Sequence, residues 1–306
     1  MLFYRQNVQM VYFGTTLKIM TCIFVLDVLH QIGFYGVYRG GRLVYDCHLI
    51  TALVERWRPE THTFHFRVGE ATITLEDVQN IWALPIDGEP VTGLDIERST
   101  EEWQIYCREY LEFSPDEEAF KGSRLHAHAI MNFIKTVEIT HDTPRPTVLQ
   151  YTRCMAMLLL GGLMYPDSSE NLVRLLYLSK LEEINAARNY SWGSAGNYVM
   201  PVSKAKRQLV VHCNCYSLSG NHMTWNSNRI MAYAADFTRK LWRSACPLIF
   251  YAIVEIHHPE RVLRQFGMRQ NILKMPDSRD MTLHQISSKA RTGTDWDVQH
   301  ILHISR

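Results

Sequence analysis

The sequence lacks a hydrophobic run long enough to span a lipid bilayer. The best candidate for a targeting segment, IMTCIFVLDVL at residues 19–29, is interrupted by Asp27. About seven apolar residues precede that aspartate, whereas a membrane-spanning helix needs roughly 20. We therefore expect this stretch to start a buried helix, and we expect no association with a membrane.

The sequence also lacks the cysteine pattern of a small disulfide-bonded protein. Its seven cysteines are an odd number and lie far apart along 306 residues. Secreted disulfide frameworks place an even number of cysteines in a short chain, so a reducing compartment is expected instead. Repeats and low-complexity linkers are missing too, and the 46% hydrophobic content is enough for a substantial core in a single domain.

Excess charge of one sign is missing from the whole chain but not from its parts. The formal net charge is +1, yet residues 55–118 carry sixteen acidic and five basic side chains, while residues 188–306 carry sixteen basic and seven acidic ones. Such polarity suits two lobes that attract each other, or a partner of either sign. A nucleic acid on the basic half is the less favoured interpretation.

Short catalytic motifs are missing as well. G-x-S-x-G, G-x-x-x-x-G-K-[ST], G-x-G-x-x-G and H-E-x-x-H do not occur. HCNC at residues 212–215, with His222, is the most metal-like cluster because zinc prefers thiolate and imidazole ligands, but its spacing fits no common zinc site. Cys246 is expected to be an inert core thiol. The basic run SKAKRQ at residues 203–208 reads as a solvated loop rather than a phosphate contact or a nuclear import signal.

Apolar residues at helical spacing dominate what is present, so the predicted fold is mainly α. Alternation around Gly69 and Glu70 predicts a small β-hairpin near residues 62–75, and Thr74 with Asp77 matches a helix cap. Near the C-terminus, Pro259 is expected to open a short helix that Gly267 ends. The other predicted helices cover residues 24–33, 46–57, 75–84, 100–113, 123–137, 147–165 and, as one long amphipathic segment, 170–195.

The stretch LVERWRPETHTFHF, residues 53–66, is either a reaction centre or a crowded piece of folded chain. His62 and His65 lie three residues apart in a strand pattern, which places them on opposite faces. They are therefore not expected to converge on one metal or substrate. Trp57 is expected to anchor the preceding helix in the core and Pro59 to end it. Two arginines, Arg56 and Arg58, would orient this junction or contact a partner.

Four sequence blocks resemble the plant mobile domain, a family that includes the MAINTENANCE OF MERISTEMS proteins, their MAIN-like relatives and long-form homologues of a plant serine/threonine phosphatase. The first block is GFYGVYRGGRLVYDCHLITALVERWRPETHTFHFRVGEATITLEDVQNIWALPIDGEPVTG. The later ones are YTRCMAMLLLGGLMYPDSSENLVRLLYL, NYSWGSA and LWRSACPLIFYAIVEIHHPERVLRQFGMRQ. The resemblance implies a plant mobile domain over residues 24–306, preceded by a non-family extension at residues 1–23.

The resemblance implies a transposon-related, non-enzymatic nuclear module used in transposon silencing, genome maintenance and meristem development. Its implied partners are nuclear proteins, including a phosphatase-like plant mobile domain protein or a MAIN-like paralogue. The family is also described as aminotransferase-like, but a pyridoxal enzyme needs a Schiff-base lysine, and none of the nine lysines has a suitable context. No phosphatase metal-binding motif is present. No catalytic residue, cofactor or metal is therefore expected, and a pyridoxal- or metal-dependent enzyme is the least favoured alternative.

Seven side chains form the candidate structural or partner surface. They are Arg56, Trp57, Arg58, His62, His65, Arg261 and Arg264. The alternative function, nucleic-acid binding by the basic C-terminal half, would use Lys204, Arg243, Arg261, Arg264 and Arg269.

One segment departs from the pattern that the resemblance implies. After NYSWGSA the family continues with a helix and a Trp-x-Trp-Glu-Arg block, which residues 196–239 lack. We predict that the domain is divergent or disrupted there, through alternative splicing, divergence of a mobile-element copy or a misassigned exon. Loss of a core helix would expose apolar faces on its neighbours.

Overall fold

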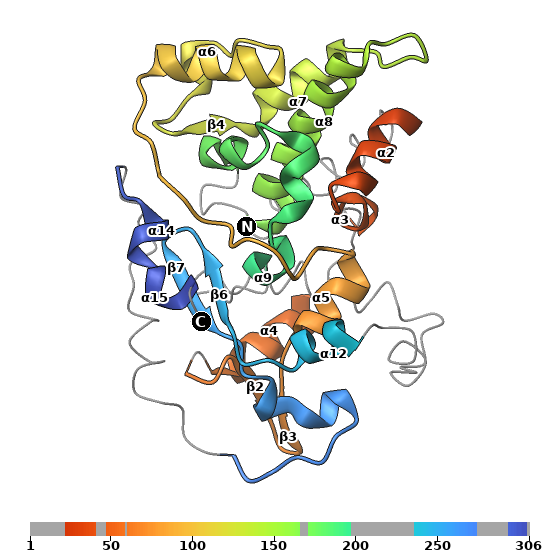
Figure 1. Ribbon diagram of the computed structural model, residues 1–306, viewed down its shortest axis with the longest axis vertical. Helices are drawn as coiled ribbons and strands as arrows, with labels where there is room; N and C mark the ends of the chain where they lie inside the picture. Colours follow the sequence, from red (N-terminus) through yellow and green to blue (C-terminus); the bar gives the residue numbers. More distant parts are fainter. Residues whose placement is uncertain are drawn as a thin grey trace. The chain divides into compact units, whose positions relative to one another are not determined.

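The computed structural model describes residues 22–40, 47–58, 60–165, 171–196, 236–273 and 293–304. Helices predominate and strands are short and antiparallel, which confirms the predicted mainly helical fold (Figure 1). The chain forms two compact units, each built from segments that are separate in sequence. Of the described residues, unit 1 contains those within Met1–Leu43, Trp82–Leu84 and Asp95–Asn189, and unit 2 those within Val44–Ile81, Pro85–Leu94 and Tyr190–Arg306.

Unit 1 is a group of helices with one small sheet. Its helices are α2 (Ile23–Gln31), α3 (Tyr35–Gly40), α6 (Thr100–Leu111), η1 (Glu117–Ala119), α7 (Ala127–Thr136), α8 (Arg145–Leu159), η2 (Leu160–Met164), η3 (Leu175–Lys180) and η4 (Ile184–Asn189). Its strands are β4 (Arg124–His126) and β5 (Leu172–Arg174), which pair antiparallel. Helix α6 begins with a capping box in which Ser99 and Glu102 bond each other's backbone N–H.

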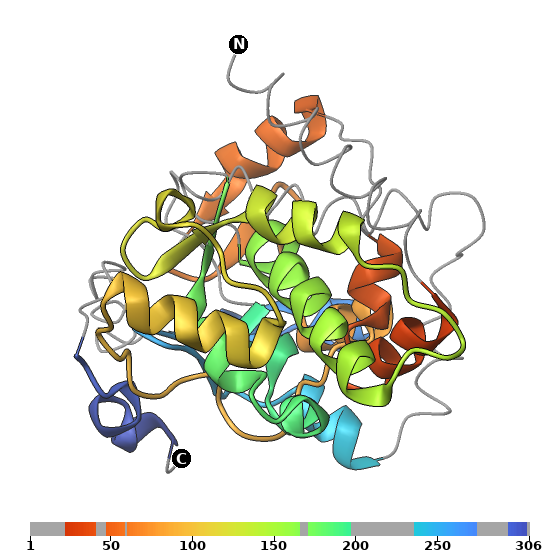
Figure 2. The same ribbon diagram turned by 90° about the horizontal axis from the view of Figure 1, so that it is seen from above.

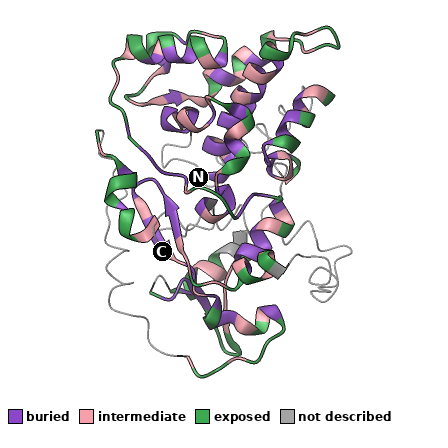
Figure 3. Ribbon diagram, viewed as in Figure 1, coloured by how far each residue is buried: buried purple, intermediate pink, exposed green. Residues whose placement is uncertain are grey.

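Helix α8 is the centre of unit 1 and contacts α2, α6 and α7 (Figure 2). Most of its residues from Val148 to Leu159 are buried, as the purple ribbon in Figure 3 shows. Together with η2 it forms a stretch, Arg145–Met164, that is long and apolar enough to cross a membrane. However, 72% of the most apolar 18 residues of this stretch is buried inside the protein. A helix apolar on all sides is typical of a protein core, and the contacts of α8 place it there.

The prediction of one long amphipathic helical segment over residues 170–195 is wrong. The chain there forms β5, two 3₁₀ helices and the short α9 (Trp192–Gly196). Strand β5 pairs with β4, and Val173 packs so closely on Gly161 that an added Cβ would lie 2.7 Å from its methyl groups. Arg153 of α8 donates to the carbonyls of Leu181 and Glu182, at 2.8 Å each. Pairing with distant segments therefore overrides the local helical period.

Unit 2 combines two small sheets with short helices. Its helices are α4 (Cys47–Arg56), α5 (Leu75–Trp82), α9, α12 (Asp236–Trp242), η5 (Pro259–Phe266), α14 (Trp296–Gln299) and α15 (Ile301–Ile304). The last residue of α5, Trp82, is assigned to unit 1. Its strands are β1 (Trp57–Arg58), β2 (Thr63–Phe66), β3 (Gly69–Ala71), β6 (Pro247–Phe250) and β7 (Ile253–Ile256). The sheet order is β1-β2-β3 in one sheet and β6-β7 in the other.

The predicted hairpin near residues 62–75 exists, with two corrections. Its turn is at Arg67 and Val68 rather than at Gly69 and Glu70, because Phe66 pairs with Gly69. A third strand, β1, begins directly after α4, so Trp57 is a strand residue and not the last turn of the helix. Helix α4 ends at Arg56.

The core of unit 2 brings residues from all parts of its sequence together. Six buried side chains form one apolar cluster: Leu75, Ile86, Trp242, Leu248, Val262 and Phe266. Leu241 and Cys246 are partly buried and pack against this cluster. The indole Nε1 of Trp242 donates to Gln79 on α5 at 2.7 Å. Thr74 and Asp77 bond each other reciprocally at the start of α5, as predicted. The β6–β7 hairpin was not predicted, because its apolar run resembles a buried helix.

Several predictions fall outside the described residues. They concern Pro59, the extension up to residue 21, the divergent segment apart from residues 196 and 236–239, the HCNC cluster with His222, and the basic residues Lys204, Lys206 and Arg207.

Candidate functional site

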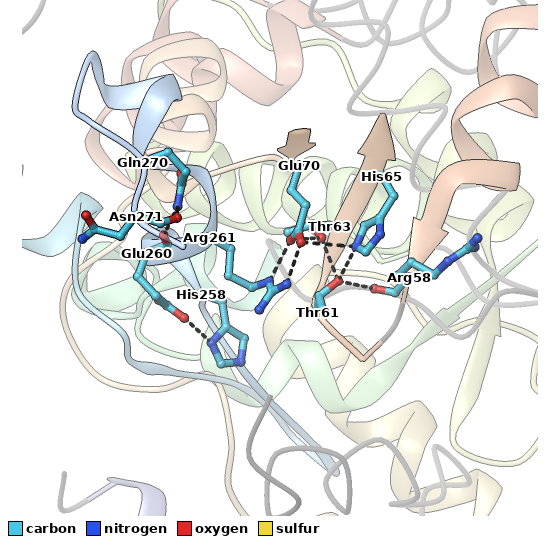
Figure 4. A network of polar contacts seen from close by, with 10 residues as sticks. All are labelled: Arg58, Thr61, Thr63, His65, Glu70, His258, Glu260, Arg261, Gln270 and Asn271. Atoms are coloured by element: carbon cyan, nitrogen blue, oxygen red, sulfur yellow. Dashed lines mark hydrogen bonds and ion pairs between the residues drawn. The ribbon is translucent and has the colours of Figure 1, made fainter. Parts of the chain in front are cut away.

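Two family-like strings lie in unit 2: WRPETHTFH at residues 57–65 and HPERVLRQFG at residues 258–267. The second string contacts the β2–β3 hairpin, which the end of the first string begins. Helix η5 enters from His258 through Pro259, which is pre-organised for a first helical position. It ends at Gly267, whose φ of 70° requires the left-handed conformation that glycine adopts without strain. Pro259 and Gly267 were both predicted at these ends. Arg261 of η5 points towards Glu70 of the β2–β3 hairpin, whereas Glu260 points towards His258 (Figure 4).

The ion pair between Glu70 and Arg261 is the centre of the contact between η5 and the β2–β3 hairpin, which we call the junction. The guanidinium makes two hydrogen bonds to the carboxylate, from Nε at 2.7 Å and from Nη2 at 2.6 Å. Only 9% of the Glu70 side chain and 10% of the Arg261 side chain are exposed. Burial raises the pKa of Glu70, but hydrogen bonds from Arg261 and Thr63 more than offset it, so the pKa lies below its ordinary value. The bidentate geometry is the strongest form of this contact.

Two threonines and a histidine extend the network along β2. The Thr63 hydroxyl donates to Glu70 Oε2 at 2.8 Å and lies 2.7 Å from the Thr61 hydroxyl. His65 Nε2 is 3.2 Å from Thr61 Oγ1 and 3.6 Å from Glu70 Oε1, and about two fifths of its side chain is exposed (41%). The network therefore runs from a dry centre at Arg261 to a solvated end at His65 (Figure 4).

Helix η5 also bonds to backbone groups next to both ends of β3. The Gln265 amide accepts from the Thr72 backbone N–H and donates to the Thr72 carbonyl, at 2.8 Å each. Arg264 Nη1 donates to the Val68 carbonyl at 3.1 Å. Arg264 and Gln265 thus cover edge backbone groups of Val68 and Thr72, just before and just after β3.

We expect Gln265→Ala to lower the free energy of unfolding by about 1–3 kcal/mol, because both part-buried backbone groups of Thr72 lose their partner. Urea denaturation of purified protein measures the change. Gln270→Ala is the matched control, since Gln270 donates to the Glu260 carbonyl in an exposed bond. Equal losses for the two variants would contradict the edge-covering role of Gln265.

His62 belongs to a second buried pair. It lies in the turn before β2 with a φ of 52°, so the prediction that it is a strand residue is wrong. Its Nε2 is 2.8 Å from Glu255 Oε2 on β7, whereas His65 faces Glu70 on the neighbouring strand. The two histidines therefore have different partners. The turn directs His62 towards β7, which a pattern of alternation cannot indicate.

His257, the residue directly after β7, is buried. Its Nδ1 is 3.1 Å from the Ser244 carbonyl. Burial lowers the pKa of His257 to about 4; the Ser244 bond and Glu260 oppose that shift, and His258 and His62 add to it. In the unfolded chain a histidine titrates near 6.5, so below that pH the unfolded state binds more protons than the folded one.

We expect stability to fall as the pH is lowered from about 6.5 to about 4, with a His257 contribution of about 2–3 kcal/mol. His257→Gln removes this contribution, so its plot of unfolding free energy against pH should be flatter than that of the unchanged protein over the same interval. Urea midpoints at half-unit pH steps give both curves. Parallel curves would show that His257 is not a buried neutral imidazole.

The remaining predicted surface residues lie at the end of α4. Trp57 is buried, with its ring edge-on to Phe64 at a centroid distance of 4.8 Å. Arg56 donates to the Ala52 carbonyl at 2.6 Å, and Arg58 to its neighbour's carbonyl at 3.1 Å. Guanidinium groups at a helix C-terminus stabilise its unpaired carbonyls. Of the seven predicted residues, Arg58, His65 and Arg261 belong to one network, which Arg58 joins through its backbone carbonyl, the acceptor of the Thr61 hydroxyl at 3.4 Å (Figure 4). Arg264 bonds to the Val68 carbonyl at the hairpin tip instead.

Sequence reasoning missed Glu70 and Glu255, the partners of Arg261 and His62, and it missed Gln265, which bonds to the backbone of Thr72. One signal was available for Gln265: with Arg261 and Arg264 it follows the i, i+3, i+4 spacing that places polar groups on one helical face. Nothing local indicates that Glu70 pairs with a residue 191 positions away.

The arrangement holds the chain together rather than presenting reactive groups. The Glu70, Glu255 and Arg261 side chains are each bonded within the protein. Among the described residues no three His, Cys, Asp or Glu side chains are grouped as a metal site. Burial raises the pKa of the Cys246 thiol to about 11 and that of Cys107 to about 12, which leaves both thiols protonated and weakly nucleophilic.

Comparison with known proteins gives consistent relatives. The chain is 29% identical to the serine/threonine-protein phosphatase 7 long form homolog of Arabidopsis thaliana, over 92% of this chain and 26% of the relative. It is 34% identical to Protein MAIN-LIKE 2 (56% of this chain, 25% of the relative) and 25% identical to Protein MAINTENANCE OF MERISTEMS (81% and 62%), both from the same plant. The chain thus spans about a quarter of the first two relatives. No solved structure shows significant similarity to it.

The family described as "Plant mobile domain" matches residues 33–196, more than half of the 306 residues. The match includes strand β1, the β2–β3 hairpin and helix α8. On this ground the chain belongs to the plant mobile domain family.

Proposed function

We propose that this chain is a non-enzymatic nuclear interaction module that acts in transposon silencing, genome maintenance and meristem development. Two kinds of partner are proposed: a phosphatase-like plant mobile domain protein and a MAIN-like paralogue. Membership of the plant mobile domain family supports the proposal, as does the name of the relative MAINTENANCE OF MERISTEMS.

The observation that carries the proposal is the internal pairing of the junction. A catalytic carboxylate or imidazole must be within reach of a substrate. Here Glu70 is bonded to Arg261 and Thr63, and His62 is bonded to Glu255. The four side chains of the two ion pairs are each about nine-tenths buried. The most distinctive strings of the chain thus build a rigid scaffold, which suits a module whose function lies on its surface.

The rival function, nucleic-acid binding by the basic half, is weakened by the same pair. Arg261 is committed to Glu70 and is buried, so it is not available to a phosphate. Arg243, another residue of that set, donates to the Arg239 carbonyl and contacts Met268 Sδ at 3.6 Å. A phosphate-binding surface requires exposed arginines, and of that set Arg243, Arg264 and Arg269 are exposed while Arg261 is not.

Affinity purification of the tagged chain from plant nuclei, followed by mass spectrometry, tests the proposal. We expect a phosphatase-like plant mobile domain protein or a MAIN-like paralogue to be retained at physiological salt. Trp242→Ala, a variant expected to be destabilised, is the control for chaperone binding. Recovery of chaperones alone by the unchanged chain would overturn the proposal. So would substitutions at His62 or His65 that abolish a measurable turnover without changing thermal stability.

A further inference from the structure

The loop that joins α7 to α8, residues 137–144, projects from the helices of unit 1 (Figure 1). Its tip lies in solvent, since the side chains of His141 and Asp142 are 90% and 101% exposed. Pro144 and Arg145, which follow the tip and lead into α8, are exposed as well. The loop therefore offers a stretch of chain to another protein without any opening of the core.

This loop contains a hydroxyl residue directly before a proline, Thr143-Pro144. The sequence has one other such dipeptide, Ser114-Pro115. Proline holds the residue before it in an extended conformation, which is the conformation in which a protein kinase binds the segment that it phosphorylates. Proline-directed kinases read this proline next to the acceptor hydroxyl, and charges that follow it add to recognition. Arg145 supplies such a charge after Thr143.

The structure makes Ser114 a poor acceptor. Its hydroxyl is exposed, but Pro115 is buried, and the Pro115 carbonyl accepts a hydrogen bond from Gln104 Nε2 at 2.9 Å. On the other side of Ser114, the ring of Phe113 stacks on that of Phe133 with centroids 4.6 Å apart. This segment is held on both sides of the hydroxyl, so it cannot enter the cleft of a kinase without losing those contacts.

The bonds of Thr143 are exposed and lie within the loop. Its Oγ1 accepts from the Thr140 N–H at 2.9 Å and lies 3.3 Å from Thr140 Oγ1. The Thr143 N–H donates to the Thr140 carbonyl at 3.3 Å. Exposed bonds in a projecting loop open at a small cost in free energy. Of the two hydroxyl–proline dipeptides, the one at Thr143 is therefore the accessible one.

A phosphate on Thr143 would act on the start of α8. The N-cap residue, Pro144, makes no side-chain cap bond, and the first turn contains no acidic residue. The first N–H groups of a helix have no partner within it, so they attract negative charge. A phosphate brings a charge of about −1.5 to −2 and three acceptor oxygens. The exposed Arg145 guanidinium is a second partner, because its present bond to Gln31 is 3.4 Å long.

We propose that Thr143 is a phosphorylation site for a proline-directed protein kinase and that its phosphate stabilises the start of α8. In the reaction Thr143 Oγ1 attacks the γ-phosphorus of ATP and forms the new O–P bond. The bond from that phosphorus to the β–γ bridging oxygen breaks, ADP leaves with the electron pair, and the hydroxyl proton passes to a base of the kinase. The inference does not depend on the proposed interaction function.

Incubation of the full chain with an active proline-directed kinase and Mg²⁺–ATP tests the site. We expect the intact mass to rise by about 80 Da, the mass added by one phosphate, and peptide mass spectrometry to place the group on Thr143. Thr143→Ala should abolish the rise. Ser114→Ala, the matched control, should be labelled as the unchanged chain is. Phosphate on Ser114 alone would overturn the inference, as would an unlabelled chain when a free peptide of residues 138–150 is labelled.

Thermal unfolding tests the effect on α8. The midpoint of the phosphorylated chain should lie about 1–3 °C above that of the unphosphorylated chain, and about 1 M salt should remove most of this difference. An equal or lower midpoint would contradict the role of the phosphate at the helix start.

The tagged chain purified from plant nuclei tests whether the site is used. We expect its peptide mass spectra to show phosphate on Thr143. Detection of the Thr143 peptide in its unmodified form alone would overturn the inference. The partners recovered in the same purification bear only on the proposed function, so the two proposals fail separately.

Discussion

Glu70→Ala is expected to lower the free energy of unfolding by about 3–5 kcal/mol, because it leaves the buried guanidinium of Arg261 without its carboxylate. The pair makes two hydrogen bonds of 2.6 and 2.7 Å with about a tenth of either side chain exposed. Breaking a buried pair on one side costs more than the net contribution of the pair, since the remaining charge is not solvated. Urea denaturation followed by tryptophan fluorescence measures the loss.

A double variant separates the isolated charge from the loss of packing. Glu70→Leu with Arg261→Met removes both charges and fills similar volumes, so it should lose less stability than Glu70→Ala alone. His65→Ala is the matched control in the same network. Its partly exposed contact with Glu70, at 3.6 Å, should contribute less than about 1 kcal/mol. A loss below about 1 kcal/mol for Glu70→Ala would show that the pair is not buried as described.

The same ion pair also predicts that the protein loses stability when the pH falls below about 4.5. The folded-state pKa of Glu70 lies below its ordinary value of 4.5. Glu70 therefore contributes stability above pH 4.5, and this contribution is lost as the pH falls through the folded-state pKa. The His257 effect begins at a higher pH, because its interval lies between about 6.5 and 4.

Trp242→Ala is expected to cost about 3–5 kcal/mol, the range for deleting a buried aromatic side chain from a packed core. Trp242 is among the largest fully enclosed side chains and lies in the apolar cluster of unit 2. It is also the last residue of α12, a helix whose first four residues, 236–239, belong to the segment that departs from the family pattern. A large loss would show that the chain beyond that segment is folded into unit 2. Thermal and urea unfolding measure it.

Two variants sharpen this experiment. Trp242→Phe keeps most of the apolar volume but leaves Gln79 without its indole donor, so a loss of about 1–3 kcal/mol is expected. Phe237→Ala, on the same helix, changes a side chain that is 64% exposed and should stay within about 0.5 kcal/mol. Equal effects at Trp242 and Phe237 would mean that α12 is not packed on α5 in solution.

Local signals predicted the elements that local contacts build. The apolar period of α8 and the capping pair of Thr74 and Asp77 act within a few residues, and both are present in the structure. Prediction failed at β5 and at β6–β7, where a short apolar run can be a strand or part of a helix. Only a partner strand decides between them, and a partner is not part of the local pattern.

The candidate site divides in the same way. Arg261 and Arg264 were singled out from the family-like string, but their roles differ: Arg261 is buried with Glu70, and Arg264 is exposed and bonds to the Val68 carbonyl at the hairpin tip. Burial separates the two, and burial depends on how segments 191 residues apart pack against each other.

The sequence by itself determined the family, the helical class, and the start and end of η5 at Pro259 and Gly267, because these rest on motifs and on the backbone preferences of single residues. Only the tertiary structure decided that His62 meets Glu255 and that Arg261 meets Glu70. Buried charges require a partner of opposite sign. The fold supplies that partner from a distant part of the chain, which no local periodicity specifies.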